Sequence, residues 1–224
     1  MPILTQEQHE IVSNAVAEAE LTTSGEIVPV LTAQSDGYTD VVLVWAAALS
    51  FTAMSLFALF PAPFTDLWDG LVGGWTHEWT TAEVATLTIA LGLIVFVATW
   101  AIQLIDPVKF AMVPGPAKSA RVHDAAVRHF KVAAEKRTHG RTGVLLYLSM
   151  NEHRAEIVAD QPIAEKVPAE VWGEAMADML AEIHKGCVAE GIAAGVRDVG
   201  KVLSEHFPRG DHDENELPDR LIEL

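Results

Sequence analysis

The chain has 224 residues and a net charge of −16 at pH 7, from 31 acidic and 15 basic side chains. Every lysine and arginine lies at or beyond Lys109, and no long basic run occurs, which argues against a nucleic-acid-binding protein. Cys187 is the single cysteine, so an internal disulfide and a cysteine metal cluster are excluded.

The N-terminal segment predicts a helix followed by a short strand. Thr5 and Gln8 have the spacing of a capping box, which indicates a helix that runs to about Glu20. Residues 26–32 are rich in β-branched side chains and predict a strand. Pro29 lies inside this strand and indicates a sheet edge or a bulge there.

Two long apolar segments dominate the middle of the chain. Residues 41–60 and 84–105 contain no charged side chain. A helix of this length covers about 30 Å, the thickness of the hydrocarbon core of a bilayer. We therefore predict a transmembrane hairpin over 41–105 with a short loop at 61–83. The alternative is a pair of buried core helices in a soluble protein. The first segment follows acidic residues and lacks a basic flank, so it does not resemble a signal peptide.

Charges around the hairpin predict its orientation. The loop 61–83 contains four acidic residues and no basic one, whereas Lys109, Lys118 and Arg121 follow the second segment. The positive-inside rule then places both termini in the cytoplasm of a protein that crosses the inner (plasma) membrane twice. The loop also contains three tryptophans, a residue type that is enriched at the membrane–water interface: Trp68, Trp75 and Trp79. Residues 69–74 are expected to form a turn. The absence of ionisable groups inside the spans argues against a channel or transporter and for an anchor in the lipid bilayer.

Further elements follow the second span. We expect a short strand over 109–113 and a helix over 118–138 that ends before Gly140. A hairpin of strands 144–149 and 154–159 comes next, then two helices that start near Pro168 and Val188. The last segment, 209–224, is an acidic tail with leucines, which docks either on its own domain or on a partner.

The order of these elements indicates one split domain. A single strand at 26–32 is not stable alone, so it must join the later strands in one sheet. Residues 1–40 and 106–208 then form a single α/β domain. About 155 residues remain outside the hairpin, which is an ordinary domain size.

Three short motifs precede the strands or lie in the hairpin turn. They are Thr23-Ser24-Gly25-Glu26-Ile27-Val28 before the first strand, Gly140-Arg141-Thr142-Gly143-Val144-Leu145-Leu146 at the central strand, and Glu152-His153-Arg154 at the hairpin turn. In this order and spacing they resemble the TPM domain family, also called TPM phosphatase, in a membrane-anchored bacterial subgroup with a two-span insertion. The resemblance covers 4–36 and roughly 117–208. It implies an α/β/α sandwich with a mixed sheet, and for some relatives a divalent cation site, often calcium, with acid phosphatase activity.

Two positions depart from the pattern of the family. Many relatives have Asp-Asn-Gly before the central strand, where this chain has Arg141-Thr142-Gly143. A cation and a hydroxyl replace a carboxylate and an amide, which weakens a site for a hard cation. Relatives commonly have Gly-x-Gly after the second hairpin strand, where this chain has Asp160-Gln161-Pro162.

The candidate site residues follow from these motifs and from the turns around them. Glu26, Asp160 and Glu152 are candidate ligands for Ca²⁺ or Mg²⁺, which take carboxylate oxygens. Arg154 and His153 are candidates for binding a phosphate group. The alternative is that all five are solvated turn residues and caps. No nucleophile and base can be paired from the sequence, so no catalytic residue is assigned.

Two functions remain open at this stage. The first is an accessory, assembly or quality-control factor that binds a membrane protein complex. The second is a divalent-metal-dependent acid phosphatase.

Overall fold

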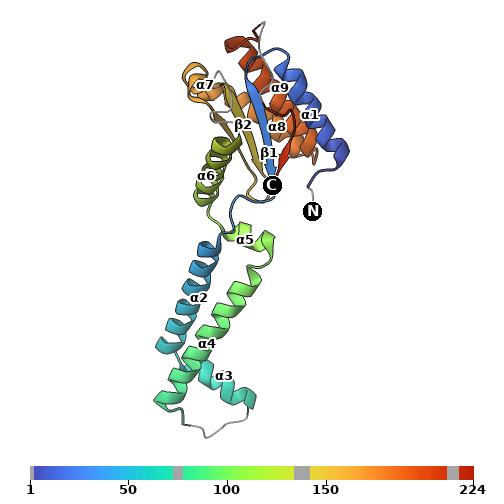
Figure 1. Cartoon of the computed structure of the whole chain (residues 1–224). Helices are drawn as coiled ribbons and strands as arrows, with labels where there is room; N and C mark the ends of the chain where they lie inside the picture. The colour runs from blue at the N-terminus through green and yellow to red at the C-terminus, as the bar shows by residue number, and fades with distance from the viewer. Residues whose placement is uncertain (1–2, 73–77, 134–141, 211–216) are drawn as a thin grey trace. The chain divides into compact units, whose positions relative to one another are not determined.

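The structure is a computed structural model that describes residues 3–72, 78–133, 142–210 and 217–224. The chain forms two compact units, Met1–Asp36 with Gly115–Leu224 and Gly37–Pro114. The first unit is discontinuous in sequence, and the second is the segment between its halves (Figure 1).

The first unit contains a four-stranded mixed sheet in the order β3-β2-β1-β4. β1 (Glu26–Thr32) pairs in parallel with β2 (Gly143–Ser149) along its whole length. β3 (Arg154–Ala159) is antiparallel to β2, and the short β4 (Ile222–Glu223) is parallel to β1. The expectation that the N-terminal strand joins the later strands is confirmed, and the unit has a mixed α/β fold.

Alternating side chains of the sheet enter two apolar clusters. Ile27, Leu31, Leu146 and others pack with α1 (Gln6–Glu20), α8 (Ala169–Ile183) and α9 (Val188–His206). Val28, Val30, Leu145 and Tyr147 pack with α6 (Gly115–Ala133). Because successive side chains of a strand point to opposite faces, these clusters cover the two sides of the sheet. The short α7 (Gln161–Lys166) adds Ile163 to the larger cluster.

Local sequence signals explain the ends of several elements. The Thr5 hydroxyl accepts a hydrogen bond from the Gln8 N–H at 3.3 Å, and the Thr5 N–H donates to the Gln8 side chain at 2.9 Å, so the capping box is confirmed. Pro29 has no N–H to donate. In β1 the main-chain groups of the odd-numbered residues point away from β2: the Ile27 N–H donates to Glu20, and the Leu31 carbonyl accepts from Leu224. On that side β4 pairs only with Val30 and Leu31. The expected edge or bulge at Pro29 was wrong, because β1 lies between β2 and β4 and pairs with β2 in unbroken register. Pro29 is tolerated because its missing N–H would point to the β4 side, where pairing begins only at Val30.

Two further expectations were wrong. Residues 109–113 belong largely to a helix, α5 (Asp106–Met112), because Pro107 occupies its first turn, where an N–H is not needed. The predicted turn at 69–74 begins inside the helix α3 (Ala62–Val72), and residues 73–74 lie outside the described residues. Of the two alternatives for the tail, the structure shows docking on its own domain: Leu217 and Leu221 are buried, and β4 pairs with β1. Gly140, the expected end of the helix over 118–138, also lies outside the described residues.

The second unit contains α2 (Thr39–Leu59), α3, α4 (Thr81–Ile102) and α5. α2 and α4 pack closely: the Ser50 hydroxyl donates to the Gly92 carbonyl at 2.8 Å, and a Cβ on Gly92 would collide with Met54. Both helices are long and apolar enough to cross a membrane. Only 22% and 11% of their most apolar windows are buried, which does not fit the alternative of two buried core helices.

Candidate functional site

The five residues selected from the sequence lie at two opposite ends of the sheet. Glu26 begins β1 and is paired with Gly143, and Asp160 follows the end of β3 beside the same glycine. Glu152, His153 and Arg154 follow the other end of β2. Seven residues of strand separate the two ends by about 20 Å. The structure thus brings Glu26 and Asp160 to one end, but not Glu152.

Asp160 closes the β2–β3 pair. Its carboxylate accepts a hydrogen bond from the Gly143 N–H at 3.0 Å, and its own N–H donates to the Gly143 carbonyl at 2.9 Å. The side chain is buried. This position gives Asp160 a structural role, as a cap that satisfies the first N–H of β2.

Glu26 connects the start of β1 to the C-terminal tail. Its Oε2 accepts a hydrogen bond from the Leu217 N–H at 3.2 Å, and its main-chain N–H donates to the Thr142 carbonyl at 3.1 Å. The Thr142 hydroxyl in turn donates to the Ser24 carbonyl at 2.9 Å. Thr142, which replaces the amide expected in the family, therefore holds the two strand entries together.

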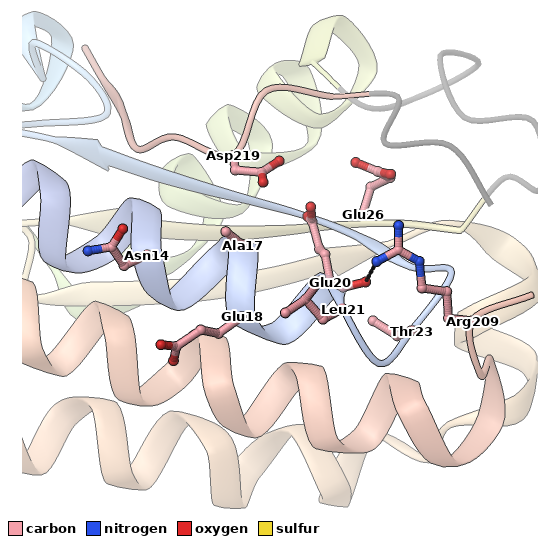
Figure 2. A pocket seen from close by; sticks show the side chains of 9 residues that line it. All are labelled: Asn14, Ala17, Glu18, Glu20, Leu21, Thr23, Glu26, Arg209 and Asp219. Atoms are coloured by element: carbon pink, nitrogen blue, oxygen red, sulfur yellow. Dashed lines mark hydrogen bonds between the residues drawn. The ribbon is translucent and has the colours of Figure 1, made fainter.

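A pocket of about 370 Å³ lies beside Glu26, and four carboxylates line it (Figure 2). They are Glu18 and Glu20 of α1, Glu26 of β1 and Asp219 of the tail. Arg209 also lines the pocket, and it donates a hydrogen bond to the Glu20 main-chain carbonyl at 3.3 Å. The pocket thus brings together residues from both ends of the chain.

The pKa of Glu20 in this pocket is strongly perturbed. Its Oε1 accepts a hydrogen bond from the Ile27 N–H at 2.8 Å. Its buried Oε2 has no hydrogen-bond donor among the described residues, but the protonated side chain hydrogen-bonds with Asp219. Burial raises the pKa of Glu20 to about 9, and the charges of Glu26 and Asp219 raise it further against the lowering effect of the Ile27 N–H. At neutral pH this carboxyl group therefore holds a proton.

Glu20 and Asp219 are not among the residues selected from the sequence. A signal existed for Glu20, because it continues the buried helical face of Val12, Val16 and Ala19. A carboxyl group on an apolar face is unusual enough to mark it as a candidate. Nothing comparable marks Asp219, whose position depends on how the tail packs against β1.

The opposite end of the sheet holds a closed hydrogen-bond network. Glu152 is 1% exposed, and its two oxygens accept hydrogen bonds from the Ser35 N–H at 2.8 Å and from the Ser149 hydroxyl. The Ser35 hydroxyl contacts Tyr147 Oη at 3.1 Å. These bonds fasten the segment after β1 to the end of β2.

His153 and Arg154 lie at the hairpin turn beside that network. His153 has a φ of 52°, and its carbonyl accepts a hydrogen bond from Arg154 at 2.9 Å. The Arg154 Nε also donates to the Ser119 hydroxyl of α6 at 3.2 Å. In the described ranges, no three histidine, cysteine or acidic side chains are placed so that they could hold a metal ion.

Comparisons with known proteins agree with the predicted family over part of the chain. A family model described as "TPM domain" matches residues 110–202, from α5 to α9. No curated protein matches the sequence. The NMR structure of the BA42 protein from the psychrophilic bacterium Bizionia argentinensis has 18% sequence identity and a TM-score of 0.56, and covers 99% of this chain and 96% of that one. The chain therefore shares a fold with BA42, and its residues 110–202 match the TPM domain.

Proposed function

We propose that the chain is a membrane-anchored TPM-like domain that acts as an accessory, assembly or quality-control factor for membrane protein complexes. In this proposal α2 and α4 form a transmembrane hairpin inserted into an α/β/α sandwich. The observation that carries it is the pair of long apolar helices, with most of their apolar surface exposed, between two halves of one α/β unit. Such surface is stable against lipid and unstable against water.

The ends of the insertion support this arrangement. Asp36, the last residue before the insertion, pairs with Arg121 of α6, the helix that begins as the chain returns. The first unit therefore places the exit and the return of the chain close together. A hairpin of two spans has the same property, because it returns the chain to the side that it left.

The three carboxylates selected from the sequence fit a protein that binds a partner better than an enzyme that turns over a substrate. Asp160, Glu26 and Glu152 each accept a hydrogen bond from a main-chain N–H. They lie at two ends of the sheet, so they do not form one centre. The charge asymmetry of the loops supports the inner (plasma) membrane, with both termini in the cytoplasm.

Membrane isolation tests this proposal in two steps. We expect the full chain to stay in the pellet when membranes are washed with alkaline carbonate, and to copurify with a membrane protein in constant ratio after digitonin extraction. A matched chain without residues 41–105 should appear in the soluble fraction. Release of the full chain by carbonate would refute the anchor, and a monodisperse protein without partners in digitonin would refute the accessory role.

The second candidate is a divalent-metal-dependent acid phosphatase. The acidic pocket favours it, because the carboxyl groups of Glu26 and Asp219 line one cavity of about 370 Å³ beside the protonated Glu20. In this alternative Glu26 contributes to a Ca²⁺ or Mg²⁺ site at that end of the sheet. Hydrolysis of p-nitrophenyl phosphate that requires Ca²⁺ or Mg²⁺, and that is lost in Glu26→Gln but kept in Glu152→Gln, would support this candidate. Equal rates with and without the ions would refute it.

A further inference from the structure

The helix α3 has one apolar side and one polar side. Its large apolar residues Phe64, Leu67, Trp68 and Leu71 have the spacing i, i+3, i+4 and i+7, which places them on one face of a helix. Their side chains are 46%, 63%, 52% and 77% exposed. An exposed apolar stripe of this kind on a soluble protein would be unstable in water, so a partner must cover it.

Local contacts fix the position of α3 against its neighbours within the same unit. The Phe64 ring packs on Phe57 of α2 with centroids 5.4 Å apart. On the opposite side of α3, Asp69 accepts a hydrogen bond from the Trp79 indole at 3.1 Å. The apolar face is therefore oriented by packing, and the polar side is held by a hydrogen bond.

The connection to α2 keeps α3 near the end of that helix. Only Phe60 and Pro61 separate the last residue of α2 from the first residue of α3. Two extended residues span about 7 Å. If α2 crosses the bilayer, α3 must then begin at the bilayer surface.

We propose that α3 is an interfacial helix that lies along the surface of the bilayer crossed by α2 and α4. Its face of Phe64, Leu67, Trp68 and Leu71 enters the boundary of the hydrocarbon, and Asp66 and Asp69 face water. This inference rests on the proposed transmembrane hairpin and adds a third contact between the chain and the lipid.

Charge and shape favour lipid as the occupant of this face. The segment 61–83 has no lysine or arginine, so it has no cation for an acidic partner or an anionic headgroup. An apolar groove of about 270 Å³ between α3 and α4 continues the same face, with Phe64, Trp68, Leu87 and Ile94 among its lining residues. Acyl chains are the apolar groups that surround such a groove in a bilayer, and tryptophan is enriched at the interface.

Spin labels on single cysteines test the inference in the full chain. The background is Cys187→Ser, since Cys187 is the single native cysteine and serine suits its place before α9. Labels are placed by Leu67→Cys on the apolar face, Asp66→Cys on the polar face, and Leu93→Cys in the middle of α4. The protein is reconstituted in phosphatidylcholine vesicles, and collision rates with oxygen and with a water-soluble nickel chelate are measured.

We expect the ratio of oxygen to nickel collisions to be highest at position 93, and severalfold higher at 67 than at 66. Equal nickel access at 66 and 67, with position 93 still exposed to oxygen, would overturn the inference and leave the hairpin intact. Nickel access at all three positions would refute the hairpin itself. Protection of position 67 from both reagents would overturn the inference in favour of a protein, either a second copy or another subunit.

Discussion

The two ends of the sheet each bury a glutamate, but in opposite states of hydrogen bonding. At the carboxyl ends of β1 and β2, both oxygens of Glu152 accept hydrogen bonds, from Ser35 and Ser149. At the other end, one oxygen of Glu20 accepts from Ile27, and the other has no hydrogen-bond donor within the described part of the chain and interacts only with the acidic side chain of Asp219. A complete network stabilises the fold, whereas an incomplete one beside other acids is available to a proton or a ligand.

This comparison indicates where a function of the first unit should be sought. At the Glu152 end both carboxylate oxygens already accept hydrogen bonds, and these bonds connect the segment after β1 to the end of β2. The pocket of Glu20, Glu26 and Asp219 combines burial with an excess of negative charge. Perturbed acids of this kind are more frequent at functional sites than in structural networks.

The largest expected effect comes from breaking the complete network. Glu152→Ala leaves two donors, the half-buried Ser35 N–H and the buried Ser149 hydroxyl, without their acceptor. We expect a loss of about 4 kcal/mol in the free energy of unfolding, at the cost of about 1–3 kcal/mol for each unsatisfied group. Chemical denaturation of the detergent-solubilised protein measures it. Glu152→Gln keeps one acceptor and should lose less; equal losses in both variants would contradict this account.

The next effect depends on pH and concerns Glu20. Its pKa rises from 4.5 to about 9 on folding, so the folded state binds the proton more tightly than the unfolded chain. The stabilising contribution of this proton is complete below about pH 4.5 and is lost as the pH rises through about 9. Glu20→Gln mimics the neutral carboxyl and should raise the stability of the protein relative to the wild type at pH 9 by about 3 kcal/mol, which is half of the roughly 6 kcal/mol that full linkage from pH 4.5 to 9 gives, because solvent in the pocket screens the charge.

Stability curves of the two proteins from pH 5 to pH 9 check this prediction. They should lie close together at pH 5 and separate as the pH rises, because the wild type alone must lose the proton. Glu7→Gln, an exposed residue in the first turn of the same helix, is the matched control and should follow the wild type. Parallel curves for Glu20→Gln and the wild type would show that the carboxyl ionises normally.

Sequence patterns were sufficient for the elements whose signals are local. The capping box of Thr5 and Gln8, the apolar alternation of β2 and the uncharged lengths of α2 and α4 each predicted an element that the structure contains. Residues 109–113 were mispredicted as a strand, whereas most of them belong to a helix that has Pro107 in its first turn. The distinction depends on what precedes the proline, which a short window does not capture.

The candidate site was harder to predict because it depends on register and on distant packing. Glu26 and Glu152 were grouped as candidate cation ligands, but Glu26 begins a strand parallel to β2 and Glu152 follows the end of β2. Parallel strands in register place such residues at opposite ends of a sheet, so this separation was accessible to reasoning. Asp219 was not, since it reaches Glu26 only through the packing of Leu217 and Leu221.

A smaller loss is expected when the other capping acid is removed. Asp160→Ala takes the acceptor from the Gly143 N–H, and we expect a destabilisation of about 2 kcal/mol in chemical denaturation. Asp160→Asn retains a carbonyl oxygen and should cost about 1 kcal/mol or less. If alanine and asparagine cost the same, the bond to Gly143 does not stabilise the end of β2.

The smallest expected effect tests whether the acidic end binds a cation. At a Ca²⁺ concentration ten times the dissociation constant, binding to the folded state would stabilise the protein by about 1.4 kcal/mol. Thermal unfolding with Ca²⁺ or Mg²⁺ would detect this as a rise in Tm.

Glu26→Gln should abolish the shift, because it removes a carboxylate from the pocket, and Asp160→Asn tests whether the capping acid also contributes. Glu152→Gln should keep the shift, because it lies at the far end of the sheet. A shift that Glu152→Gln removed and Glu26→Gln kept would move the cation to the closed network, and would reverse the contrast between the two ends.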